Sequence, residues 1–159
     1  MSSAKDLVFE KTTCFTAVRS NETTIGLMAT GTLALDGKVY NAISGPWNRG
    51  VLPNGTYTVK KYNVVASATA DSFKSPSGKG WFIPLKQPAN IKRSGFGIHP
   101  DGNVEGTAGC IGLVGAEADS FWEQWIGMSM ADRPESLTVS GAETAGDNKR
   151  KISGTGTDE

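Results

Sequence analysis

The chain has 159 residues, and its 16 lysine and arginine residues balance its 16 aspartate and glutamate residues. This length suits one domain with a substantial core, and the balanced charge argues against the basic patches that bind nucleic acid or anionic membranes. No apolar run approaches the ~20 residues of a membrane span, and residues 1–6 lack the charged-then-apolar layout of a secretory signal. We therefore expect no transmembrane segment, no nucleic-acid partner and no signal peptide.

The first half of the chain has the pattern of strands joined by tight turns. Residues 7–10, 12–19 and 23–28 are rich in Val, Phe and Thr, and residues 57–65 and 81–85 are again extended in character. The clearest local signal is Asp36-Gly37 between the runs 32–35 and 38–43, because both positions of a two-residue hairpin turn favour positive φ. These patterns predict a mainly β fold.

The second half adds one helix to this β pattern. Residues 116–128 carry an apolar stripe of Phe121, Trp122, Trp125 and Met128. We expect this helix to pack on the sheet, with a last strand at 137–139. The polar segment 68–80 is either a binding loop or an unstructured insertion. Residues 1–140 are thus predicted to form one domain, followed by a disordered tail over 141–159.

The glycine-rich segment 95–113 carries the chemistry. It holds the only histidine, His99, one of the two cysteines, Cys110, and six glycines. A cysteine nucleophile needs a base, and His99 is the only imidazole in the chain. Gly109 and Gly112 flank Cys110, where they would leave the sulfur accessible and backbone N–H groups free for an oxyanion hole. The alternative is structural, with His99 capping the turn at 100–102 and Cys110 filling the core.

Two further alternatives concern the cysteines and a metal. Cys14 lies in an apolar strand-like run, where packing is the expected role, although a Cys14–Cys110 disulfide would consume the nucleophile. A zinc site would need about three protein ligands. His99, Asp101 and Glu105 are close in sequence, but a single histidine excludes the usual two-histidine sites. We expect neither a metal nor a cofactor.

The segment 107–113, T-A-G-C-I-G-L, with His99 upstream, resembles the catalytic motif of the L,D-transpeptidases (YkuD-type domain). That motif is a histidine, a spacer, and then Ser/Thr-His-Gly-Cys. Residues 35–45 and 51–59 resemble the opening hairpin and following turn of the same domain, so the resemblance spans about residues 32–125. Ala108 replaces the second histidine, Gly112 stands where Arg or Asn is common, and the spacer is short, as in compact effector and phage members.

The resemblance implies an L,D-transpeptidase-like β-sandwich or barrel that acts on peptidoglycan stem peptides. Cys110 would be the nucleophile, His99 its base and the Pro100 carbonyl the third element, while Thr107 and Gly109 would shape the acyl pocket and oxyanion hole. Hydrolysis of the thioester would give L,D-carboxypeptidase or endopeptidase action, and aminolysis would give transpeptidation or D-amino-acid exchange. The candidates for binding the peptide are Gly112, Trp47, Trp81, Lys92 and Arg93.

The biological role follows from that substrate. We expect an antibacterial effector toxin that acts in the periplasm or cell wall after delivery by a secretion system or by lysis, with an immunity protein as partner. Two alternatives stay open: a phage-encoded lysis protein, and a catalytically inactive wall-binding module of the same fold.

Overall fold

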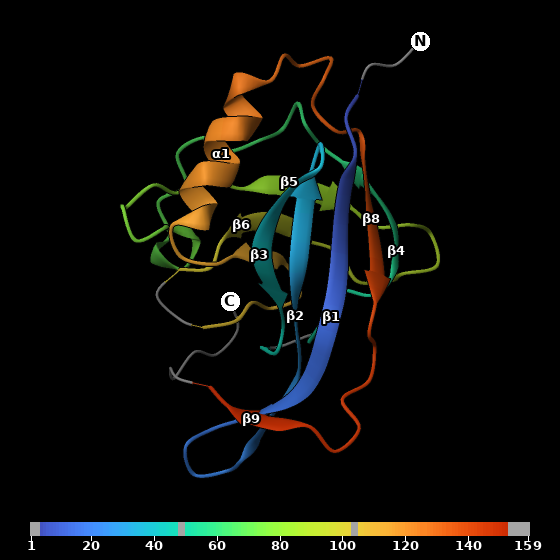
Figure 1. Ribbon diagram of the computed structural model, residues 1–159, viewed down its shortest axis with the longest axis vertical. Helices are drawn as coiled ribbons and strands as arrows, with labels where there is room; N and C mark the ends of the chain where they lie inside the picture. The colour runs from blue at the N-terminus through green and yellow to red at the C-terminus, as the bar shows by residue number, and fades with distance from the viewer. Residues whose placement is uncertain (1–3, 48–49, 103–104, 153–159) are drawn as a thin grey trace.

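Eight strands close into a mixed β-barrel, and a ninth extends one wall (Figure 1). The computed structural model describes residues 4–47, 50–102 and 105–152. The strands are β1 (Leu7–Val18), β2 (Thr24–Leu35), β3 (Lys38–Ser44), β4 (Gly55–Val59), β5 (Ile83–Lys86), β6 (Gly97–Pro100), β7 (Ile111–Leu113), β8 (Ser136–Gly141) and β9 (Lys149–Lys151). Their order is β2-β3-β7-β6-β5-β4-β8-β1, and the β1–β2 pairing closes the barrel. The prediction of a mainly β fold is confirmed.

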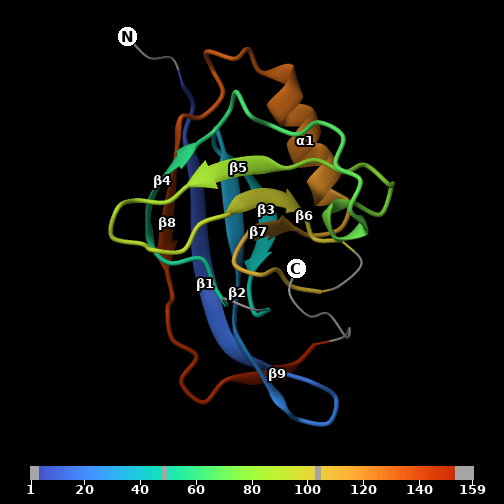
Figure 2. The same cartoon turned by 180° about the vertical axis from the view of Figure 1, so that it is seen from behind.

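The strand directions place two sequence-distant segments beside each other. Most pairs are antiparallel, but β6 and β7 are parallel, as are β1 with β8 and β1 with β9. In the view from behind (Figure 2), β5, β6 and β7 lie together on the face opposite β1. The predicted hairpin is also confirmed, since Asp36 (φ 51°) and Gly37 (φ 82°) turn β2 into β3 with Leu35 opposite Lys38.

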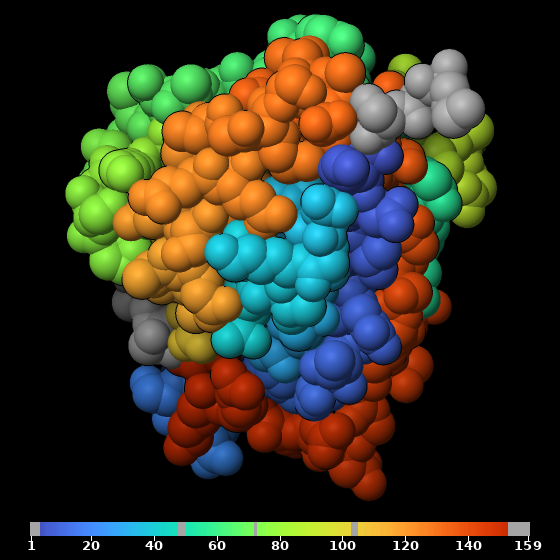
Figure 3. Space-filling view, turned by 45° about the horizontal axis from the view of Figure 1, so that its top comes forward, coloured from blue at the N-terminus to red at the C-terminus, as the bar shows by residue number. Residues whose placement is uncertain are grey.

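The helix α1 (Glu117–Gly127) packs against the barrel, close to the predicted 116–128. Phe121 and Trp125 are fully buried, and Trp81 stacks on Phe121 and Trp122 with ring centroids 5.5 and 5.1 Å apart. In the space-filling view (Figure 3), the orange surface of α1 lies between the cyan β2–β3 hairpin and the green segment around residues 60–80. The aromatic stripe thus joins the helix to the main core, as the periodicity predicts.

The C-terminal segment differs from the disordered tail that we expected. Lys149–Lys151 form β9, which pairs parallel with Thr16, Ala17 and Val18 at the lower end of β1 (Figure 1). Ile152 is buried in a second apolar cluster with Phe15, Met28 and Trp47. Three exposed basic residues carry no local strand signal, so the pairing depends on the distant β1. Residues 153–159 lie outside the described part of the chain.

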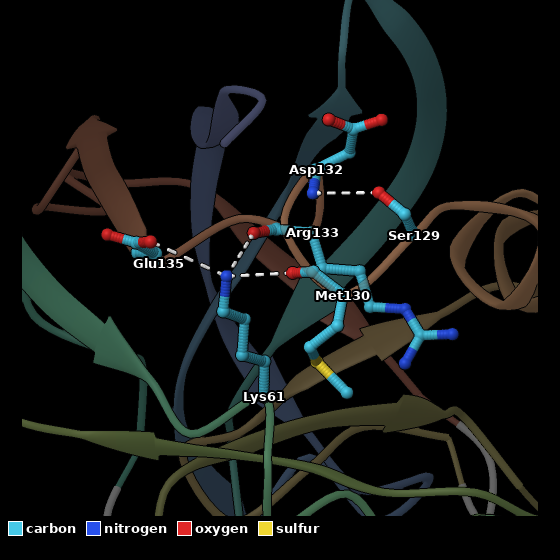
Figure 4. A network of polar contacts seen from close by, with 6 residues as sticks. All are labelled: Lys61, Ser129, Met130, Asp132, Arg133 and Glu135. Carbon is cyan, nitrogen blue, oxygen red and sulfur yellow. Dashed lines mark hydrogen bonds and ion pairs between the residues drawn. The ribbon is translucent and has the colours of Figure 1, made fainter. Parts of the chain in front are cut away.

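The connection between β4 and β5 is fastened to the loop after α1. The predicted strand 57–65 ends at Val59, and Lys61, only 6% exposed, turns inward. Its Nζ donates to the carbonyls of Met130 (2.9 Å) and Arg133 (3.1 Å) and lies 3.5 Å from Glu135 Oε2 (Figure 4). These acceptors compensate the cost of burying an ammonium group. The described helices include none that is long and apolar enough to cross a membrane.

Candidate active site

His99 and Cys110 are brought together by the parallel pairing of β6 with β7. His99 lies opposite Gly112, and Cys110 immediately precedes β7. Side chains two residues apart in a strand point to the same face, so the position of Cys110 lies on the side of the sheet to which His99 points. Both side chains line one open pocket of about 410 Å³. The structure thus places the predicted pair at a single site.

The hydrogen bonding of His99 fixes its tautomer. Nδ1 lies 2.7 Å from the carbonyl oxygen of Pro100. A carbonyl only accepts hydrogen bonds, so Nδ1 carries the proton and donates it, which leaves Nε2 with a free lone pair. His99 is 4% exposed, and burial lowers its pKa from 6.5 to about 4, although the bond to Pro100 opposes this shift. At neutral pH the imidazole is an uncharged base.

Cys110 is a neutral thiol in the same environment. Its Sγ lies 3.8 Å from the carbonyl oxygen of Gly95. Burial raises the pKa of the thiol to about 11, while a backbone hydrogen bond from Gly97 partly offsets this shift. The site therefore rests as a thiol beside a neutral imidazole. Such a pair reacts by transferring the thiol proton to the imidazole during attack on the substrate.

Two phenylalanine rings flank the imidazole. The Phe73 ring centroid lies 4.3 Å from that of His99, and the Phe82 ring stacks on it at 5.8 Å with an interplanar angle of 13°. A Cβ on Gly97 would lie 2.1 Å from Phe82 Cζ, so only glycine at this position leaves room for the ring. The apolar run 81–85 indicated a strand or a cleft wall, and Phe82 lines the pocket, whereas Phe73 was not predicted. The one signal for Phe73 is that it is a lone aromatic in a polar segment.

Thr107 organises the loop before Cys110 and does not line the pocket. Its Oγ1 donates to the Cys110 carbonyl (2.6 Å) and accepts from the N–H groups of Gly45 (3.1 Å) and Gly109 (3.3 Å). The side chain is 1% exposed. We expected Thr107 to shape the acyl pocket directly, but its contacts make it a support for the turn that carries Cys110.

Gly109 and Gly112 serve the packing of the same turn. Gly109 has φ 110°, and its N–H already points to Thr107 Oγ1, so this donor is engaged and not free for an oxyanion. A Cβ on Gly112 would lie 3.0 Å from Thr107 Cγ2 and 3.1 Å from Asp101 Cβ, which leaves little space for a larger side chain. The described contacts of Gly112 are therefore structural.

The remaining predicted peptide-binding residues are absent from the described lining of the pocket that holds Cys110. Trp81 is fully buried in the main core, and Trp47, 2% exposed, donates through Nε1 to the carbonyl of Glu105 at 2.7 Å. Arg93 donates through Nη2 to the Val51 carbonyl (3.1 Å) and lies over the Phe96 ring. Lys92 is exposed outside the pocket lining. The pocket walls are instead apolar, formed by Val65, Ala68, Ala70, Phe73, Phe82 and Ala108.

The alternatives to a thiol site find little support in this geometry. Both cysteines are free, and Cys14 is buried in the wall of β1. The proposed zinc ligands are divided between pockets, since His99 lines the same pocket as Cys110 whereas Asp101 and Glu105 line another. Among the described residues, no group of three or more His, Cys, Asp and Glu side chains could hold a metal ion.

Comparison of the chain with models of known protein families, with curated proteins and with solved structures finds no match. The chemical interpretation of this site therefore rests on its residues and their geometry.

Proposed function

We propose that this chain is an L,D-transpeptidase-like cysteine acyltransferase that acts on peptidoglycan stem peptides. The observation that carries the proposal is the meeting of His99 and Cys110 in one open pocket, with His99 Nδ1 bound to the Pro100 carbonyl. This arrangement contains the three elements that the motif resemblance implies. The closed barrel with a helix packed on it is compatible with the L,D-transpeptidase-like fold, which we propose for this chain.

The reaction follows from the resting protonation of the two groups. Cys110 Sγ attacks the carbonyl of an L-centre residue bonded to a D-amino acid while His99 Nε2 takes the thiol proton. The new C–S bond forms, the C–N bond breaks, and the departing amine of the D-residue receives the proton from His99. Water or a second amine then attacks the thioester with His99 again as base, which restores the thiol. Water gives hydrolysis, and an amine gives transpeptidation or exchange.

Purified muropeptides test this activity directly. The wild-type protein is expected to release D-alanine, Cys110→Ala to abolish release, and His99→Ala to lower it by about 10²- to 10⁴-fold, the usual contribution of a general base. Chelation with EDTA should change nothing. Release that survives Cys110→Ala would overturn the thiol mechanism, and loss on chelation would support a metal site instead.

The short spacer of the motif and the proposed peptidoglycan substrate favour an antibacterial toxin. Such a protein would be delivered into the cell wall and would require an immunity protein. Expression targeted to the periplasm should then lyse cells, whereas cytoplasmic expression should not. Toxicity confined to the cytoplasm would contradict both the toxin and the phage lysis role. Binding of sacculi without any cleavage would favour the inactive wall-binding module, for which Ala108 and Gly112 are the sequence arguments.

A further inference from the structure

The base of the proposed reaction is enclosed by a segment distant in sequence. Phe73 ends the 3₁₀ turn η1 (Asp71–Phe73), and its ring is the nearer of the two aromatic rings against His99, at 4.3 Å. The Phe73 and Phe82 rings also contact each other, with centroids 5.3 Å apart. The imidazole thus forms one member of a three-ring cluster, which we call the aromatic clamp and define as Phe73, Phe82 and His99.

The segment that carries Phe73 is anchored at several points. Backbone hydrogen bonds of 2.9 Å in both directions join Val65 with Phe82, and a further one joins the N–H of Ala68 to the Gly80 carbonyl. Ser75 Oγ donates to Asp119 Oδ1 on α1 at 2.6 Å. Because these bonds fix the segment to the barrel and to the helix, the Phe73 ring has a defined position over His99. The polar segment 68–80 is therefore a built part of the site.

The charged groups near the aromatic clamp lie outside the pocket that His99 lines. The titratable groups in the described lining of the His99 pocket are His99 and Cys110. Asp71 and Lys74, which flank Phe73, and Asp101, two residues after His99, line a neighbouring pocket. On α1, Asp119 accepts from Ser75 and Glu117 from Asn41, and at the end of β5 Lys86 is exposed. The protonation of His99 is accordingly governed by ring packing and by the exclusion of water.

We propose that Phe73 is a positioning residue for the base: its ring, held by the 65–82 segment, seats the His99 imidazole against Phe82 and shields it from water. The catalytic meaning of this assignment rests on the proposed function, but the seating itself does not. Removal of the ring admits water to the imidazole, which favours its protonated form and loosens its orientation toward Cys110. The 71–73 turn thereby sets the pH range in which the site holds a neutral base.

His99 is the only histidine, so one imidazole signal in a ¹³C–¹H NMR titration reports on this site alone. We expect the wild-type signal to titrate near pH 4. In Phe73→Ala the midpoint should rise by about one pH unit or more, and the acid limb of kcat/KM on muropeptides should move with it. Phe73→Tyr should restore both. Ser75→Ala, which releases the segment from Asp119 and keeps the ring, should shift the midpoint in the same direction by less.

The matched control is Tyr62→Ala, which removes an aromatic ring from the same connection between β4 and β5, at a site 76% exposed and outside the pocket lining. It should leave the titration and the acid limb unchanged. If Phe73→Ala does not fold, Phe73→Leu and Ser75→Ala serve in its place. An unchanged His99 midpoint in the folded ring-deleted variant would overturn the inference. If the midpoint shifts in Phe73→Ala but the wild type cleaves no muropeptide, the seating of His99 is supported and the proposed function is overturned.

Discussion

The two cysteines of this chain differ in exposure and in what surrounds them, since Cys14 is buried and Cys110 is only partly buried. Cys14, 2% exposed, lies in β1, and its thiol donates a hydrogen bond to the Ala142 carbonyl at 3.1 Å. Cys110 lines an open pocket beside a neutral imidazole. Burial raises the pKa of both thiols above the ordinary value. Acidity therefore does not distinguish the proposed nucleophile from Cys14; access for a substrate and an imidazole in the same pocket do.

The largest expected effect is a loss of activity on replacing Cys110 that does not occur on replacing Cys14. Cys110→Ala should reduce D-alanine release by at least about 10³-fold because the nucleophile is lost. Cys14→Ala should retain wild-type activity and lose about 1 kcal/mol of unfolding free energy through a small core vacancy. Assays of release and urea denaturation on both variants measure these outcomes. Equal loss of activity in both variants would remove the distinction.

Alkylation sharpens the comparison without a substrate. In the folded protein, iodoacetamide should modify Cys110 and spare Cys14, which peptide mass mapping can resolve. The rate at Cys110 should keep rising by nearly tenfold per pH unit toward pH 11, since the thiolate is the reactive form and the pKa of this thiol is about 11. A plateau already reached near pH 7 would contradict the neutral resting pair and indicate a thiolate–imidazolium pair.

The free energy of unfolding should depend on pH through His99. The pKa of His99 is about 4 in the folded protein against an ordinary value of 6.5, so the unfolded chain binds the extra proton between these values. Stability is therefore full above pH 6.5 and falls as the pH drops toward 4, by on the order of 3 kcal/mol. Urea denaturation across this range should show this loss in the wild type and a smaller one in His99→Gln. Parallel curves for the two proteins would contradict a buried neutral His99.

The smallest expected effect is a difference in stability between substitutions of two threonines, one near each cysteine. Thr107→Val removes the buried hydroxyl that bonds three backbone groups around Cys110, and should cost about 1–3 kcal/mol of unfolding free energy with a fall in kcat. Thr12→Val, whose hydroxyl makes one exposed bond to the Thr30 carbonyl, should change stability by at most about 0.5 kcal/mol. Similar losses in both variants would argue against the support role of Thr107.

Local features of the fold could be predicted from the sequence more accurately than long-range pairings. The Asp36-Gly37 turn and the α1 periodicity depend on neighbouring residues, so both were predicted with nearly correct bounds. The pairing of His99 with Cys110 could be inferred because one short glycine-rich segment holds both groups. β9 was not predicted, since its pairing with β1 joins residues more than 130 positions apart and three basic residues show no apolar alternation.

The composition of the pocket was the least predictable part. Trp47 and Trp81 are residue types that suit either a core or a binding site, and burial decides for the core in both cases. Phe73 is the only large apolar residue of segment 68–80, and its proposed role depends on the 65–82 pairing that folds it over His99. Residue type indicated the proposed catalytic pair, whereas topology determined the walls around it.

The most direct test of the central claim is to trap the acyl-enzyme. The protein is mixed with a tetrapeptide muropeptide, quenched in acid within one turnover and analysed by intact-protein mass spectrometry and peptide mapping. We predict a thioester adduct with the mass of the stem lacking its terminal D-residue, located on Cys110, present in wild type and Cys14→Ala and absent in Cys110→Ala. Release of D-alanine by the wild type with an adduct that persists in Cys110→Ala would contradict the account.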